Sequence, residues 1–268
     1  MLNRKGFTLI GVIMILAVLA ILVGMAIPFA FRLFEVSQKK ETQEEMKKIR
    51  QAIVGSADLG TYGYVGDMGR FPANLGELNT RGSQPNYTTA GRISSVGMGW
   101  RGPYLNEGFY PASHLEDSWG NNYGYTVSTA PGPDGLMGTS DDVVTAKIQS
   151  YGPDKAPDTQ DDLFAEEMTL KGKLRLKVTI GMTDNIPRSV DPKLYFADNG
   201  YECTTPLQGT MVTLPGEKGT WSYIDFAPVH HGVHALIVNM GNIQENVVVN
   251  ITGGITSDTT VVVPIGVK

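Results

Sequence analysis

The sequence predicts an α+β protein, in which a long N-terminal helix packs on a small antiparallel β head and an all-β immunoglobulin-like sandwich follows. Three features of the 268 residues predict this order. Residues 6–31 are mainly apolar and carry no formal charge, residues 57–168 are rich in Gly, Pro, Asn and Tyr, and residues 169–268 contain several short β-branched runs. The chain is long enough for an anchor and roughly two modest domains.

The first predicted element is one continuous helix over residues 7–56, of which about residues 7–31 cross a membrane. With a rise of about 1.5 Å per residue, the uncharged segment spans roughly 38 Å, enough to cross a bilayer. Pro28 is tolerated there at the cost of a kink. After the span, apolar residues recur at helical spacing among Lys and Glu residues: Val36, Met46, Ile49, Ile53 and Val54.

The N-terminal residues resemble those of a known class of protein. A short basic leader containing Arg4 and Lys5 ends at Gly6, and Phe7 opens the apolar helix in the segment FTLI. With Pro28 inside the helix, this pattern resembles type IV prepilins and the pseudopilins of type II secretion. The resemblance implies that a prepilin peptidase removes residues 1–6 and that Phe7 becomes N-methylated. It also implies that the helix is first an inner-membrane anchor and later the core of a filament, where it contacts other pilins or pseudopilins.

One position departs from the family pattern. The family usually has a glutamate four residues after the processed phenylalanine, and its carboxylate is thought to meet the N-terminal amine of a neighbouring subunit. Here that position is Gly11. Because an unpaired carboxylate is costly in hydrocarbon, glycine removes both that cost and the attraction to a partner. The resemblance then implies a minor or tip subunit, whereas the alternative is that Gly11 only permits close helix packing.

The middle segment, residues 57–168, predicts a globular head of loops and short antiparallel strands. The segments WRGPYL (residues 100–105) and DSWGNNYGY (residues 117–125) resemble corresponding segments of the major pseudopilin of type II secretion. Large aromatic side chains can cover the polar half of the long helix, and we interpret them as core residues rather than as a sugar-binding platform. They are Trp100, Tyr104, Trp119, Tyr123 and Tyr125.

The head contains an internal repeat rich in aspartate. The segment GPDGLMGTSDDV at residues 132–143 recurs twenty residues later as GPDKAPDTQDDL, and residues 132–162 hold seven aspartates against two lysines. These carboxylates repel one another unless a cation or solvent relieves the repulsion. Calcium takes six to eight oxygen ligands in loosely specified geometry, and the spacing is not that of an EF-hand.

We therefore predict one or two calcium ions, held either by each repeat separately or by both repeats together. The major pseudopilin binds calcium in a similar aspartate-rich loop, as the resemblance implies. The alternative is that solvated aspartates simply cap turns. The candidate ligands are Asp134, Thr139, Asp141 and Asp142 in the first copy, and Asp154, Asp158, Thr159, Asp161 and Asp162 in the second.

The C-terminal segment, residues 169–268, predicts about seven strands, which fits an immunoglobulin-like sandwich. His230, His231 and His234 lie close together, but strand-like surroundings favour a strand-to-strand turn over a zinc site. Cys203 is the only cysteine, so no intramolecular disulfide forms and we expect a buried thiol.

These features predict a structural subunit, minor or at the tip, of a type II secretion pseudopilus or a type IV pilus-like filament. The N-terminus is cytoplasmic because Arg4 and Lys5 directly precede the span, and the filament is periplasmic or on the cell surface. The sandwich then meets secreted substrate or another tip subunit. The rival function is a surface adhesin, or a minor type IV pilin, whose sandwich binds an external target.

Other functional classes are disfavoured by the sequence. The formal net charge is -5 without a basic surface, which disfavours nucleic acid as a ligand. No catalytic motif of a serine hydrolase, a phosphate-binding loop or a metalloprotease occurs, so we expect no enzyme. The polar group His114, Glu116 and Asp117 is interpreted as part of a turn.

Overall fold

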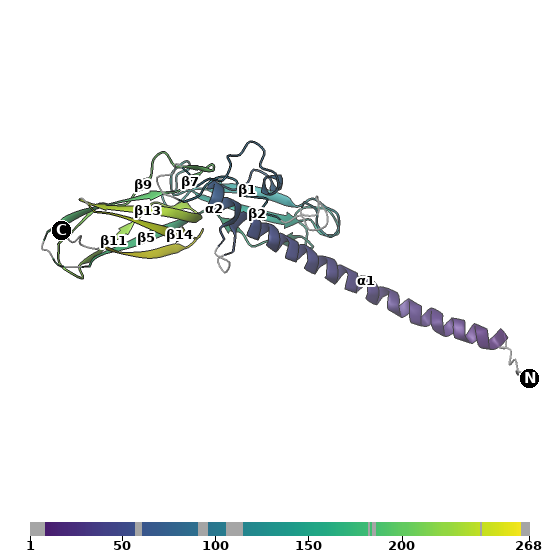
Figure 1. Ribbon diagram of the computed structural model, residues 1–268. Coiled ribbons are helices and arrows are strands. Elements are labelled where there is room, and N and C mark those ends of the chain that lie inside the picture. The colour runs from purple at the N-terminus through teal and green to yellow at the C-terminus, as the bar shows by residue number, and fades with distance from the viewer. Residues whose placement is uncertain are drawn as a thin grey trace, which may run out of the picture.

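A computed structural model describes residues 9–56, 61–90, 96–105, 115–181, 183, 186–241 and 243–263. A single long helix projects from an elongated body of strands (Figure 1). This helix, α1 (Leu9–Val54), has 46 residues and contains Pro28. It ends at Gly55, whose φ of 75° and close approach to the carbonyl of Thr61 leave no space for a side chain. The predicted continuous helix is confirmed over the described residues.

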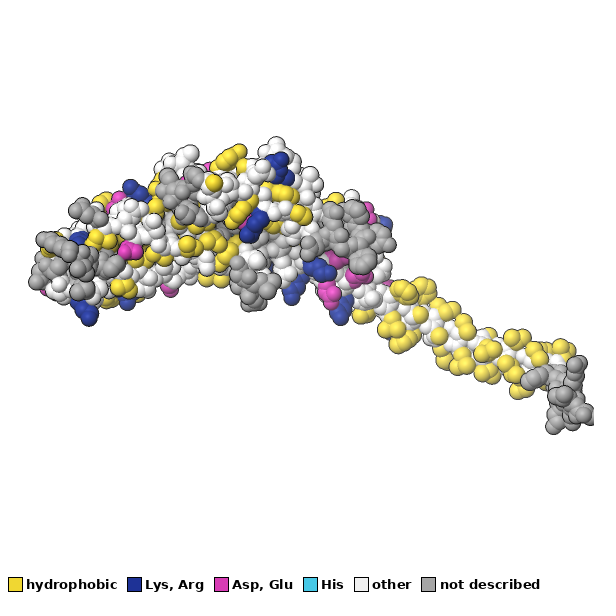
Figure 2. Space-filling model, viewed as in Figure 1, with side chains coloured by type: hydrophobic (Ala, Val, Ile, Leu, Met, Phe, Trp, Pro, Cys, Tyr) yellow, Lys and Arg dark blue, Asp and Glu magenta, His cyan; other side chains and the backbone are white. Residues whose placement is uncertain are grey.

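The two parts of α1 differ in what surrounds them. Residues 12–36 are all exposed, and hydrophobic side chains cover this part of the helix (Figure 2). By length and composition it is able to cross a membrane. The later part buries one stripe against the head, namely Thr42, Met46, Ile49, Ala52 and Ile53. Three of the five apolar residues expected on this face are therefore buried, whereas Val36 is exposed and Val54 half-buried.

The head is built from two short helices and one small antiparallel sheet. The helices are α2 (Gly63–Met68) and η2 (Leu75–Leu78). The sheet has the order β1-β2-β3, with β4 also paired to β2. Its strands are β1 (Gly124–Ala130), β2 (Val143–Ser150), β3 (Leu163–Phe164) and β4 (Met168–Thr169). The predicted head of short antiparallel strands is confirmed.

The aromatic residues of the head pack as the sequence predicts. Tyr123 is buried in the core shared with α1, and its hydroxyl donates a hydrogen bond of 2.8 Å to Glu45 Oε2 on that helix. The other four aromatic residues named above pack partly buried against the same core. The prediction that they are core residues is confirmed, and direct contact with α1 is shown for Tyr123.

The C-terminal strands form two open sheets over a shared core. One sheet has the order β10-β6-β13-β14 with β9 on β6, and the other has the order β11-β5-β12 with β15 on β5. Leucine, valine and isoleucine side chains from both sheets form one cluster between them. The long strands are β5 (Lys171–Ile180), β6 (Arg188–Tyr195), β11 (Trp221–Asp225), β13 (Gly232–Met240), β14 (Ile243–Ile251) and β15 (Thr256–Val263). The short ones are β7 (Ala197–Asp198), β8 (Tyr201–Glu202), β9 (Leu207–Gln208), β10 (Val212–Leu214) and β12 (Val229–His230).

The α+β class is confirmed, but the immunoglobulin-like form of the C-terminal sheets is not. In immunoglobulin constant domains the first and last strands belong to different sheets. Here the first strand of the region, β5, and the last, β15, are parallel neighbours in one sheet. β5 therefore lies between β15 and β11, with which it pairs antiparallel.

The head and the C-terminal sheets meet at a tight junction around α2. A side chain at Gly69 would collide with the carbonyl of Ala197 in β7, and one at Gly232 in β13 would collide with Gly66 in α2. Val96 and Met98 of the head also share a small buried cluster with Ala197 and Ala235. Because the backbones approach so closely, the body is continuous from α1 to the far sheets (Figure 1).

Candidate metal centres and the helix junction

The two aspartate repeats are the connections at the two ends of β2. The first loop (residues 131–142) joins β1 to β2, and the second loop (residues 151–162) joins β2 to β3. β2 has eight residues, so the loops are separated by about 23 Å along the strand. This separation is too large for one ion to contact both loops. A calcium ion would therefore be bound by one loop alone.

The first loop is closed by hydrogen bonds to its own aspartates. The Asp134 amide donates to Asp141 Oδ2 at 3.2 Å, and the Leu136 amide donates to Asp134 Oδ1 at 2.8 Å. The Gly138 amide donates to Asp142 Oδ2 at 2.7 Å. The Thr139 hydroxyl donates to Asp141 Oδ1 at 2.7 Å. These bonds gather three carboxylates and one hydroxyl around a ring of backbone, as expected of an Asx-turn loop.

The second loop repeats this arrangement residue for residue. The Asp154 amide donates to Asp161 Oδ2 at 3.2 Å, and the Asp158 amide to Asp162 Oδ2 at 2.7 Å. The Thr159 hydroxyl donates to Asp161 Oδ1 at 2.8 Å. Two left-handed positions also match, because Gly135 and Gly138 of the first loop correspond to Lys155 and Asp158 of the second, whereas Gly152 is left-handed and its counterpart Gly132 is not. The repeat in sequence is thus a repeat in structure.

A comparison of equivalent positions in the two loops shows that Asp158 differs from the other candidate ligands. Its counterpart in the first loop is Gly138, which has no side chain, and both residues act through the backbone amide. The candidate ligands common to both loops are three aspartates and one threonine: Asp134, Asp141, Asp142 and Thr139, and Asp154, Asp161, Asp162 and Thr159.

The charge of each loop supports cation binding. The first loop has three aspartates and neither Lys nor Arg, and the second has four aspartates and Lys155, so each carries a net charge of -3. The Thr139 hydroxyl lowers the pKa of Asp141, and Thr159 does the same for Asp161, so these carboxylates stay ionised. Within the described residues, however, no three His, Cys, Asp or Glu side chains already converge as a metal site. An ion would need backbone oxygens and water as further ligands.

The remaining residues singled out in the sequence fall in several places. Gly6, Phe7 and His114 lie outside the described residues. Gly11 and Pro28 lie in the exposed part of α1. Asp117 is buried and organises a turn, because its carboxylate accepts hydrogen bonds from the amides of Trp119 and Asn121 and from the Ser150 hydroxyl. The turn interpretation is confirmed for Asp117.

The histidine group forms part of the junction with α1. His230 ends β12 and His234 lies in β13, so the predicted strand-to-strand turn is confirmed. His231 Nε2 lies 2.7 Å from the carbonyl of Val54, the last residue of α1, and its Nδ1 accepts a bond of 3.1 Å from the Gly253 amide. The ring is therefore neutral, with its proton on Nε2, and ties the end of the helix to the sandwich.

Burial opposes a positive charge on all three histidines. Desolvation lowers the pKa of His230 and His231, and it lowers the pKa of His234 to about 4. His234 Nε2 lies 2.7 Å from the carbonyl of His230, whereas its buried Nδ1 has no partner in the described part of the chain. The charged groups that face these rings are Arg50 on α1, Lys171 on β5 and Asp198 on β7.

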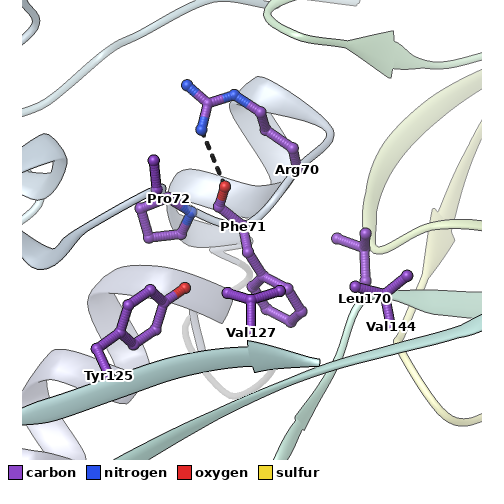
Figure 3. A pocket seen from close by; sticks show the side chains of 8 residues that line it. Arg70, Phe71, Pro72, Tyr125, Val127, Val144 and Leu170 are labelled. Atoms are coloured by element: carbon purple, nitrogen blue, oxygen red, sulfur yellow. Dashed lines mark hydrogen bonds between the residues drawn. The ribbon is translucent and has the colours of Figure 1, made fainter. Parts of the chain in front are cut away.

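A buried thiol and an open groove complete the candidate sites. Cys203 is buried, as expected, and its sulfur accepts a hydrogen bond from the Phe196 amide at 3.5 Å. The groove, of about 360 Å³, lies between residues 70–73 and the core-facing side of the head sheet, at the edge of the core (Figure 3). Its lining is mainly apolar, with Phe71, Val127 and Leu170 beside the ring of Tyr125. The described residues that line it include no cluster of reactive side chains.

Comparisons with known proteins leave the family of this chain open. No protein-family model and no curated protein matches the sequence. One solved structure, described as a "putative cell adhesion protein" from Bacteroides fragilis, shares 9% identity over 46% of this chain and 60% of that chain, with a TM-score of 0.26. Another with the same description, from Bacteroides ovatus, shares 17% identity over 58% of this chain and 68% of that one, with a TM-score of 0.19. Scores this low carry no argument about fold or function.

The matched left-handed positions predict that glycine is the more stable residue at this position in both loops. Because Lys155 has a φ of 62°, Lys155→Gly should raise the free energy of unfolding of the detergent-solubilised protein by about 0.5–1 kcal/mol. Lys155→Ala removes the same charge but keeps the strained Cβ, so it serves as the control. Gly135→Ala should be destabilising by a similar amount. Denaturant melts in chelator measure all three, and equal stabilities of the Lys155→Gly and Lys155→Ala variants would contradict the argument.

The buried histidines predict that acid loosens the junction. Their folded pKa values lie below the ordinary value of 6.5, so the unfolded chain takes up protons first and stability falls as the pH drops from about 6.5 towards 4. For His234 alone the loss at pH 4 is on the order of 3 kcal/mol. Asp67, whose pKa burial raises to about 6, changes stability in the opposite direction. The contribution of His231 is measured by comparing the free energy of unfolding of wild type and His231→Gln across this pH range. Identical pH profiles would contradict a contribution of His231 to the acid sensitivity.

Proposed function

We propose that this protein is a structural subunit, minor or at the tip, of a type II secretion pseudopilus or a type IV pilus-like filament. The observation that carries the proposal is the division of α1. Its first part exposes apolar side chains on every side, whereas its second part is packed into a folded head. The sequence supports the same function, because a leader ends at Gly6 and the FTLI segment follows it.

The proposed mechanism is an exchange of surroundings for the apolar helix. Before assembly the exposed part of α1 lies in the inner membrane, with the N-terminus in the cytoplasm, where prepilin peptidase acts. During assembly it leaves lipid for a bundle of equivalent helices, in which small residues such as Gly11 permit close approach. The absence of the usual glutamate at that position supports a place at the tip. The proposal includes an immunoglobulin-like class for the C-terminal sandwich. This sandwich meets secreted substrate or another tip subunit.

Calcium is the second part of the proposal. Two loops with the same hydrogen-bond pattern, the same net charge and two matched left-handed positions support two equivalent ions, one in each loop. The ions would relieve the repulsion among three carboxylates and fix each loop to the strand that it follows. The same candidate ligands recur at both ends of β2, although only the first loop lines a large cavity, and this favours a structural role for the ions over a role in substrate binding.

Processing tests the assignment to a filament subunit. We expect intact-mass and N-terminal sequence analysis of the protein extracted from its native membrane to find a chain that begins at Phe7 and carries one extra methyl group. Gly6→Ala should be cleaved slowly or not at all, because the peptidase reads the residue before the cut, and its precursor should not enter filaments. A mature chain that begins at Met1, or after Pro28, would exclude this function and leave a tethered periplasmic protein.

Calcium titration of the detergent-solubilised full chain tests the metal centres. We expect two ions per chain, and a gain of about 2.7 kcal/mol in stability for each site at a calcium concentration one hundred times its Kd. Asp141→Asn and Asp161→Asn should each remove one ion. Glu217→Gln, an exposed charge outside the loops, is the matched control and should bind both. A calorimetric trace without bound calcium, together with an unchanged melting temperature, would rule out structural ions.

A further inference from the structure

The sheet formed by β11, β5, β12 and β15 has an outer face that is charged at one end and aromatic at the other. Pairing of β11 and β15 with the central strand β5 places the outward side chains in rows. One row is Asp225, Arg175 and Asp258, and the next is Tyr223, Lys177 and Thr260. The third row begins with Trp221. The face thus changes from charged to aromatic along the strands.

The aromatic side chains on this face are held in place but not covered. Trp221 is 51% exposed and Tyr223 is 50% exposed, and their ring centroids lie 5.0 Å apart at an angle of 65°. Lys177 Nζ lies 4.9 Å from the Trp221 ring centroid, and Arg175 Cζ lies 5.7 Å from that of Tyr223. These cation–π contacts fix the rings from one side and leave about half of their surface open to solvent.

The charged end of the face continues into a cleft. A cavity of about 870 Å³ lies between the first aspartate loop and the start of β5, and Arg175 and Asp225 belong to both its lining and the outer face. Its other charged groups include Lys171 and Lys173 on one side and Asp141 on the other. The volume and the position between two domains are those of ligand sites in proteins.

We propose that this outer face, together with the cleft, binds a neutral glycan. Exposed aromatic rings stack on the C–H faces of sugar rings, because the ring face is negative and the C–H bonds carry positive partial charge. Hydroxyl groups both donate and accept hydrogen bonds, so they complement a lining in which carboxylates alternate with Arg175 and the lysines. The Arg175 guanidinium pairs with Asp225 at 2.9 Å, which fixes donors and acceptors side by side.

The mixed sign of the lining distinguishes a neutral glycan from polyanions. A nucleic acid or an acidic polysaccharide presents negative charge at regular intervals, and Asp225 and Asp258 on the outer face would repel it. An apolar partner would leave the same charged rows without water. This inference concerns the C-terminal sheets and the adjoining first loop of the head, and it does not depend on assembly of the chain into a filament.

Titration of the full chain in detergent with defined oligosaccharides tests the inference. The probes are cellohexaose and chitohexaose as neutral glycans, an alginate hexasaccharide as an acidic glycan, and single-stranded (dT)20. We expect binding of at least one neutral probe, detected by calorimetry and by a change in tryptophan fluorescence. That fluorescence signal should vanish in Trp221→Phe, because the chain has three tryptophans and only this one lies on the face.

Matched variants separate the site from the fold. Trp221→Ala and Tyr223→Ala should each weaken binding at least tenfold, whereas Tyr201→Ala, an equally exposed aromatic residue on β8, should bind like wild type. Thermal melts check that all three variants fold, and Arg175→Gln should weaken binding without removing an aromatic ring. The inference is overturned if no neutral probe binds at millimolar concentration, if the Trp221 and Tyr223 variants bind normally, or if alginate or (dT)20 binds more tightly than the neutral probes.

Discussion

The structure depends on helix α1, which buries apolar side chains in the head along its second part and exposes them along its first part. Met46, Ile49 and Ile53 are buried in the head core, so the end of α1 cannot leave the head without exposing them to water. The earlier part of the same helix is not covered by any described part of the chain. Because a continuous helix transmits its orientation, whatever covers the exposed part, lipid or other helices, also positions the body of strands.

The junction at the end of α1 also fixes the orientation of the C-terminal sheets relative to the helix. His231 joins the last carbonyl of the helix to the turn at Gly253, and Gly69 and Gly232 let α2 touch both β7 and β13 at backbone distance. A flexible linker would let the two domains move independently. Here the close contacts fix the C-terminal sheets to the helix, and these sheets lie at the opposite end of the molecule from its apolar part (Figure 1).

Sequence reasoning succeeded where the signal is local and failed where it depends on pairing. The apolar helix, the long strands and the aromatic core were readable from composition and periodicity. The two-residue strands β8, β9 and β12 are not predicted, because so short a run has no period, and β7 is not distinguished from the end of β6. The parallel pairing of β15 with β5 and the contact of His231 with Val54 join residues far apart in the chain, and no short pattern encodes them. The equivalence of the two loops was visible in sequence, but their separation follows only from the length of β2.

That separation gives the two loops different neighbours. The first loop faces the sandwich, because Lys171 Nζ donates to the Ser140 carbonyl at 2.9 Å and Asp141 lines the cleft. The second loop faces the helix, because the Gly152 carbonyl accepts from Asn121, whose turn also contacts Thr42 and Gln38 of α1 through Ser118. Two loops with the same aspartate and threonine pattern therefore lie at the two ends of the head. An ion in the second loop would brace the helix against the head, whereas an ion in the first would shape the cleft beside the proposed glycan face.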